Sequence, residues 1–127
     1  MKNFKVTEEK AGGVVLFKLQ GYLNDLGGEE VEKQFNRAVK EGNKKFILDF
    51  GKIAYINSIG VSFLVGVMEA TRENSLKVCF TALSQINEEL FEIVGLKKYA
   101  ATFKTTPEAM DFLNRNGGPS DRLRTQT

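Results

Sequence analysis

Residues 44–68 read KKFILDFGKIAYINSIGVSFLVGVM, and this stretch decides how the chain folds. The apolar run at 46–50 predicts a strand buried on both faces, and the run at 59–72 predicts a helix. Asn57 and Ser58 stand where that helix begins, at free backbone N–H groups and a dipole that favour negative charge. Ser58 could therefore accept a phosphate group, or it could cap the helix and have no further role.

The segments before this stretch predict a hairpin followed by a helix. Apolar runs at residues 4–7 and 14–19 flank a loop at 10–13, which is longer than the tightest hairpin turns. A turn-rich connection over 21–28 follows. Apolar residues at helical spacing then predict a helix that ends at Gly42.

The segments after it continue the alternation of strand and helix. They predict a buried strand at 76–81, a helix capped by Ser84, a short strand at 99–103 and a last helix at 106–113. In the helix that Ser84 caps, four apolar residues are expected to face inward: Ile86, Leu90, Ile93 and Val94. The chain therefore predicts one α/β domain over residues 1–113, with a mixed, mainly parallel sheet of about five strands, an N-terminal hairpin and about four helices. Residues 114–127 are expected to form a disordered tail.

The composition excludes several classes of function. Positive and negative charges balance over the body of the chain, which argues against a nucleic-acid-binding face. Histidine is absent, so Ser-His-Asp and Cys-His mechanisms and His-ligated metal sites are excluded. The single cysteine, Cys79, lies in an apolar run and predicts a core residue in a reducing compartment. With no signal-peptide pattern and no apolar run long enough to cross a bilayer, a cytoplasmic protein is expected.

Two loops are expected to lie together at one edge of the sheet. One contains Asn24 and Asp25, which suit turn and cap positions, and the other contains Ser58. Adjacent parallel strands would bring both loops to the edge where open α/β sheets tend to place their sites. The pair Gly27–Gly28 is interpreted as a flexible turn rather than a nucleotide cradle.

The helix that follows Ser58 carries small residues that suggest close contacts. Gly60 and Gly66 are unfavourable in a helix, so they predict that backbone or a partner approaches closely, with packing on the sheet inside the domain as the favoured cause. Ser62 is expected to be a small residue that faces a neighbour.

Five segments, in order and without a large gap, resemble the motifs of STAS domains. They are 19–24 (LQGYLN), 46–50 (FILDF), 56–61 (INSIGV), 90–96 (LFEIVGL) and 106–110 (TPEAM). The resemblance runs from about residue 4 to residue 113 and is strongest to the bacterial anti-sigma factor antagonists, or anti-anti-sigma factors.

The resemblance implies a mechanism of partner switching in transcription regulation. In this family, an anti-sigma factor that is also a serine kinase binds the unphosphorylated domain and releases its sigma factor. The kinase can instead phosphorylate the serine at the helix start, which breaks the complex, and a phosphoserine phosphatase resets the switch. That serine maps onto Ser58. The residues implied in partner binding are Asn24, Asp25, Asn57, Ser58, Ile59, Gly60 and Ser62.

The chain departs from the family pattern beside this serine. Asn57 stands where the family has an aspartate, and Ile59 stands where it has a small residue. Asn24 likewise replaces an aspartate of the first loop, although Asp25 follows it. These changes leave open a different kinase partner, or a domain that binds its partner constitutively.

Two other classes of function stay open. A STAS accessory subunit of a membrane transporter would have the same fold, with the transporter on a separate chain. An enzyme with Ser58 as nucleophile would need a lysine or carboxylate base that the motifs do not supply. We therefore expect a monomeric regulator with no enzymatic activity, no cofactor and no metal.

Overall fold

The computed structural model describes residues 4–116 of the 127-residue chain. The elements in chain order are β1 (Phe4–Ala11), β2 (Val14–Leu23), α1 (Asp25–Lys40), β3 (Lys45–Ile56), α2 (Ser58–Glu73), β4 (Lys77–Thr81), α3 (Gln85–Val94), the short 3-10 helix η1 (Leu96–Lys98), β5 (Ala100–Phe103) and α4 (Thr106–Asn116). The predicted tail mostly lies outside the described residues. Its first three residues continue α4, which the sequence had ended at Leu113.

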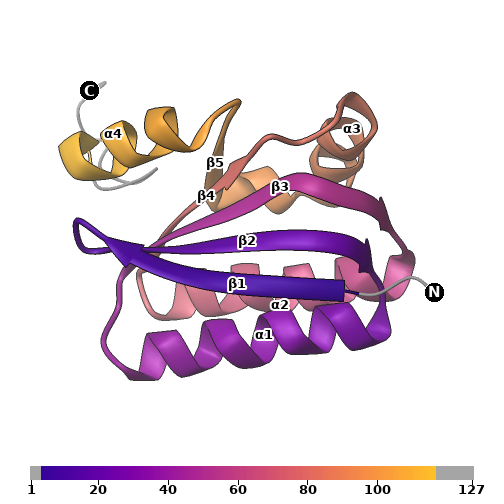
Figure 1. Ribbon diagram of the computed structural model, residues 1–127, viewed down its shortest axis with the longest axis horizontal. Helices are drawn as coiled ribbons and strands as arrows, with labels where there is room; N and C mark the ends of the chain where they lie inside the picture. The colour runs from indigo at the N-terminus through magenta and orange to yellow at the C-terminus, as the bar shows by residue number, and fades with distance from the viewer. Residues whose placement is uncertain (1–3, 117–127) are drawn as a thin grey trace.

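The five strands form one mixed sheet in the order β1-β2-β3-β4-β5 (Figure 1). β1 pairs with β2 antiparallel, and every other pair is parallel. The predicted fold class is therefore confirmed. Each parallel crossover passes through a helix, so the connections from β2 to α1, from β3 to α2 and from β4 to α3 all leave the sheet at the same edge.

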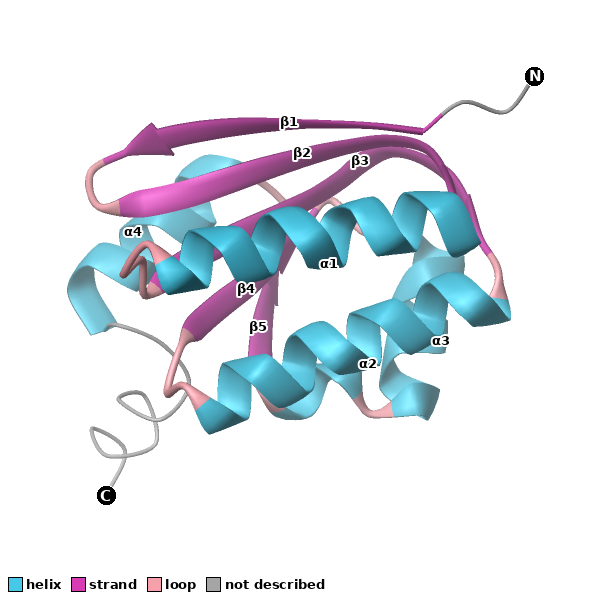
Figure 2. Ribbon diagram, turned by 90° about the horizontal axis from the view of Figure 1, so that it is seen from below, coloured by secondary structure: helices cyan, strands magenta, loops and turns pink. Residues whose placement is uncertain are grey.

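Apolar side chains on both faces of the sheet build two cores. α1 and α2 lie side by side over one face, and α4 lies on the opposite side (Figures 1 and 2). The larger core is under α1 and α2 and includes Phe17, Phe46, Leu48 and Phe50. The smaller core is under α4 and includes Ile47 and Cys79, together with Val14, Ala109, Phe112 and Leu113. The unbroken apolar run of β3 follows from this burial on both faces.

Cys79 is fully buried in the smaller core, as its apolar surroundings in the sequence predict. Burial raises the pKa of its thiol to about 12.

The strands are longer than their apolar runs. The hairpin closes on Gly12 and Gly13 alone, both at positive φ (59° and 78°), so the expected longer loop is wrong. β2 continues to Leu23 and β3 continues to Ile56, where the sequence predicted connections. The last residues of these two strands are covered by helices on one face of the sheet only. Polar and apolar residues therefore alternate there, and the apolar run that marks a strand in the sequence ends early.

α3 turns a different face to the core from the one predicted. Ile86 and Ile93 are 77% and 83% exposed, and Val94 is exposed as well, whereas Phe91 is fully buried. The Phe91 ring meets those of Phe50 and Phe80 edge-on, with centroids 5.3 Å and 5.1 Å apart. An aromatic side chain buries more apolar area than an isoleucine and gains from edge-to-face packing, so the helix is rotated to favour it. Of the four expected residues, Leu90 alone packs partly against the core.

Candidate functional site

The candidate site lies where β2 and β3 end side by side. Leu23 and Ile56 are register partners in these parallel strands, so the residues that follow them, Asn24 and Asn57, are neighbours. The backbone N–H of Asn57 donates to the Leu23 carbonyl oxygen at 3.1 Å, which ties the two strand ends together. The expectation that both loops share one edge of the sheet is confirmed.

Two asparagines cap the two helices that start at this edge. Asn24 Oδ1 accepts a hydrogen bond from the Gly27 N–H at 3.1 Å, and Asn57 Oδ1 accepts one from the Gly60 N–H at 2.8 Å. Both therefore satisfy a backbone donor that the helix leaves free. The cap interpretation of Asn24 is confirmed. Asp25 is instead the first residue of α1, exposed, where a carboxylate favours the helix start.

Ser58 is not the cap of α2, so the cap interpretation of this residue is wrong. It is the first helical residue, it is exposed, and its hydroxyl has no hydrogen-bond partner within residues 4–116. The backbone N–H groups of Ser58 and Ile59 also have no acceptor in that part of the chain. An amide side chain at Asn57 takes the capping role because its oxygen reaches the third N–H of the helix. The Ser58 hydroxyl is thereby left available at the positive end of the dipole.

Glycine lets α2 begin in direct contact with the end of β2. A Cβ added to Gly60 would collide with the Leu23 carbonyl oxygen and lie 2.8 Å from its carbon. The prediction of a close approach to the sheet is therefore confirmed for Gly60. Gly66 is close to a different neighbour, since its Cβ would lie 2.5 Å from Glu32 Oε2 of α1. Its expected contact with the sheet is wrong.

Gly27 and Gly28 lie inside the first turn of α1 and do not form a flexible turn. Both are buried. A Cβ on Gly28 would lie 2.5 Å from the Phe63 ring of α2, and one on Gly27 would lie 2.9 Å from the Tyr22 carbonyl oxygen. The two small residues let the N-terminal ends of α1 and α2 approach each other and the sheet. They fix the Asn24 loop beside Ser58.

Three apolar side chains are exposed in the segments that meet at this edge. Ile59 follows Ser58 and is 49% exposed, Leu26 in the first turn of α1 is 73% exposed, and Tyr55 at the end of β3 is 54% exposed. The Tyr55 ring lies against Tyr22, with centroids 5.7 Å apart. Ser62 is exposed one turn after Ser58, and its hydroxyl donates back to the Ser58 carbonyl at 3.2 Å. Exposed aliphatic side chains in the first turns of two neighbouring helices, such as Leu26 and Ile59, are typical of a protein-binding surface.

Leu26 and Tyr55 were missed by the sequence analysis. The alternation of β3 could not have placed Tyr55, because two register shifts against β2 interrupt it between Asp49 and Tyr55. Leu26 gave no signal of its own, because a single apolar residue in the first turn of a helix does not indicate whether it is buried. Of the residues implied in partner binding, Gly60 is buried and Asn24 and Asn57 are partly buried, so these three shape the edge. Asp25, Ser58, Ile59 and Ser62 are exposed.

The part of the chain that the structure describes contains no helix long and apolar enough to cross a bilayer.

Sequence comparison identifies the family. Residues 5–109 match the STAS domain family, and this match spans most of the chain. The chain therefore belongs to the STAS family.

The relatives include proteins named as anti-sigma factor antagonists. One is BtrV of Bordetella bronchiseptica, which is 29% identical over 111 residues, covering 80% of this chain and 96% of that protein. Another is the anti-sigma-B factor antagonist of Staphylococcus aureus, which is 26% identical over 80 residues, covering 63% of this chain and 74% of that protein. These relatives support a role as an anti-sigma factor antagonist.

Solved structures share the fold. The unphosphorylated form of the anti-sigma factor antagonist SpoIIAA superposes with a TM-score of 0.73 at 18% identity, covering 87% of this chain and 99% of that one. The phosphorylated form of SpoIIAA from Bacillus gives a TM-score of 0.70 at 21% identity, covering 86% of this chain and 99% of that one.

Proposed function

We propose that this protein is an anti-sigma factor antagonist that binds an anti-sigma serine kinase through the edge around Ser58 and is released when Ser58 is phosphorylated. The observation that carries the proposal is the position of Ser58. It is the first residue of α2, exposed, with a hydroxyl that no residue of 4–116 engages. A kinase can therefore reach this hydroxyl without unfolding the domain.

The exposed apolar side chains at this edge explain how a phosphate would break the complex. Leu26 and Ile59, in the first turns of α1 and α2, offer the kind of contact area that a partner covers when it excludes water. A phosphate adds about two negative charges and a tightly held hydration shell at pH 7. Bringing that charge into an apolar interface without a counter-charge is strongly unfavourable, so the phosphorylated form would bind its partner weakly.

The domain itself would tolerate the same charge. Negative groups in the first turn of a helix are favoured by the dipole, and the free N–H groups of Ser58 and Ile59 can donate to phosphate oxygens. α2 has no acidic residue in its first turn to repel the phosphate. Phosphorylation would therefore change binding and leave the fold intact, as a reversible switch with a phosphatase requires.

Phosphate transfer to Ser58 is the decisive test. The protein is incubated with ATP and the anti-sigma kinase encoded nearest to its gene, and the product is analysed by mass spectrometry. We expect one phosphate on Ser58, and none on the Ser58→Ala variant, which should still bind the kinase. Phosphate elsewhere, or none while the complex demonstrably forms, would leave a constitutive binding module.

A matched pair of aspartate variants tests the location of the switch. Ser58→Asp should weaken binding of the kinase at least tenfold, because it places a charge in the centre of the proposed interface. Ser75→Asp adds the same charge at an exposed position just beyond the far end of α2, and binding should be unchanged. Equal effects of the two variants would mean that net charge, and not the edge around Ser58, governs binding.

A further inference from the structure

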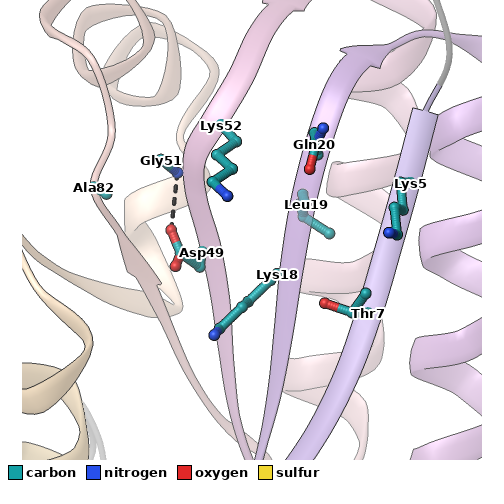
Figure 3. Close-up of a pocket in the computed structure, with 9 residues that line it drawn as sticks. All are labelled: Lys5, Thr7, Lys18, Leu19, Gln20, Asp49, Gly51, Lys52 and Ala82. Atoms are coloured by element: carbon teal, nitrogen blue, oxygen red, sulfur yellow. Dashed lines mark hydrogen bonds between the residues drawn. The ribbon is translucent and has the colours of Figure 1, made fainter.

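The sheet has an open polar face that the Ser58 edge does not use. α4 covers this face over the first residues of β2, β3 and β4, where Val14, Ile47 and Cys79 are buried. Farther along the strands, a hollow of about 500 Å³ opens over β1, β2 and β3 (Figure 3). Its volume is in the range of sites for small molecules. The hollow is on the side of the sheet opposite α1 and α2.

Strand register arranges the polar side chains of the hollow in two rows. One row is Lys5, Gln20 and Lys52, and the other is Thr7, Lys18 and Asp49, each with one residue from β1, β2 and β3. Register partners on adjacent strands point to the same side of a sheet. With strands about 4.8 Å apart, Lys5 and Lys52 stand about 10 Å from each other with Gln20 between them. Both ammonium groups can therefore reach one anion placed over Gln20.

A β-bulge in β3 is what turns Lys52 into this hollow. Phe46, Leu48 and Phe50 point into the larger core, and strict alternation would send Lys52 after them. Between the pairs Lys18–Asp49 and Gln20–Lys52, however, β3 has one residue more than β2. The extra residue reverses the alternation and puts Lys52 on the open face beside Gln20, as Figure 3 shows.

The Asp49 side chain stabilises the bulge. Its Oδ1 accepts a hydrogen bond from the Gly51 N–H at 2.8 Å. A Cβ on Gly51 would lie 3.1 Å from that oxygen and 3.3 Å from the Ala82 side chain, which is tight. Bulges are frequent next to functional sites because they re-aim side chains.

The charges that line the hollow favour an anion. The lining contains three lysines and one aspartate, and that aspartate accepts the hydrogen bond from the Gly51 N–H. Lys5 and Lys52 make no ion pair with any residue of 4–116. Lys18 lies 3.2 Å from Glu9, but both side chains are about half exposed, and such a pair is weak enough to exchange for a ligand. The Thr7 hydroxyl and the Gln20 amide add neutral donors on the same face.

We propose that this hollow binds a small phosphorylated ligand, with the phosphate over Gln20 between Lys5 and Lys52 and the rest of the molecule along β1 and β2. Lysine ammonium groups are suitable partners for a phosphate dianion. The site is separate from Ser58, so the protein would carry a ligand site in addition to its partner-binding edge.

Titration of the folded protein with ribose 5-phosphate, followed by ¹H–¹⁵N spectra, tests the proposal. We expect saturable shifts of the amides of β1, β2 and the β3 bulge, and none with ribose. Lys52→Gln and Lys5→Gln should each weaken binding about tenfold, while Lys33→Gln, an exposed lysine of α1, should not. Shifts that never saturate, or that respond equally to all three variants, would mean ionic screening alone and would overturn the proposal.

Two further variants test the charge of the hollow and its independence from the Ser58 edge. Asp49→Asn keeps the acceptor for the Gly51 N–H but removes the negative charge, so it should tighten binding several-fold; weaker binding would contradict the electrostatic argument. Ser58→Ala should bind ribose 5-phosphate as the unaltered chain does, whatever its effect on the kinase. Tighter binding of a polyglutamate peptide than of ribose 5-phosphate would assign the hollow to an acidic protein segment and would also overturn the proposal.

Discussion

Replacing Gly60 by alanine tests whether the start of α2 is held against the end of β2. The added Cβ would collide with the Leu23 carbonyl oxygen, which also accepts the Asn57 N–H at 3.1 Å. Neither group can move away alone, because one is in the sheet and the other is at the helix start. Relieving the collision requires the helix to move outward and that hydrogen bond to lengthen.

The expected magnitude follows from two opposing effects. Alanine favours the helix over glycine by about 1 kcal/mol. Overpacking costs about 1–3 kcal/mol, and a collision with a fixed main-chain carbonyl belongs at the upper end of that range, so a net loss of about 1–2 kcal/mol in the free energy of unfolding is expected. At about 4 °C per kcal/mol for a domain of this size, the Tm should fall by about 4–8 °C.

Gly66→Ala is the matched control, since it makes the same change in the same helix. Its Cβ would meet Glu32 Oε2 at 2.5 Å, but this is the far end of a flexible side chain that can rotate away. The Tm of this variant should stay the same or rise by up to about 4 °C, because the helix-propensity gain is then not opposed. Thermal denaturation followed by far-UV circular dichroism measures both. Equal shifts for the two variants, or a neutral Gly60→Ala, would refute the reasoning.

Four other changes have defined outcomes. Leu64→Ala should lower the free energy of unfolding by about 2–5 kcal/mol, because Leu64 is 1% exposed and its loss leaves a cavity in the larger core; an unchanged urea midpoint would contradict that packing. Asn57→Ala should cost about 1 kcal/mol in urea denaturation through the lost bond to the Gly60 N–H, and Asn57→Asp, which keeps the acceptor, should cost less. Thr81→Val should stabilise the fold by about 1 kcal/mol in urea denaturation, because the buried Thr81 Oγ1 has no hydrogen-bond partner among residues 4–116. Thr71→Val is the control and should not stabilise the fold, because the Thr71 hydroxyl donates to the Val67 carbonyl. Burial raises the pKa of the Cys79 thiol to about 12, so the native protein should resist a thiol reagent at pH 8. The free energy of unfolding should fall as the pH rises from about 9 toward 12, because the unfolded chain loses the thiol proton first. Cys79→Ala should remove the contribution of this thiol to that pH dependence.

The sequence by itself determined the order of elements and the fold class. The apolar run of β3, the helical spacing of α2 and the turn residues between elements are local signals, and each reports the burial that its own segment needs. The pairing of β2 with β3 followed from the preference for parallel strands to be joined through a helix. The position of Asn24 and Ser58 at one edge was predictable for the same reason.

Tertiary structure alone decided which face of α3 is buried, which residue caps α2 and to which side of the sheet Lys52 points. The rotation of α3 depends on Phe91 meeting Phe80 of the preceding strand β4 and Phe50 of β3, which is far from α3 in the sequence. Asn57 caps α2 and Ser58 is its first residue, and a start shifted by one residue would exchange these roles. Helix boundaries are set by hydrogen bonds that residue types do not fix. The bulge that turns Lys52 to the open face depends on the register between β2 and β3, a relation between two segments that no local pattern contains.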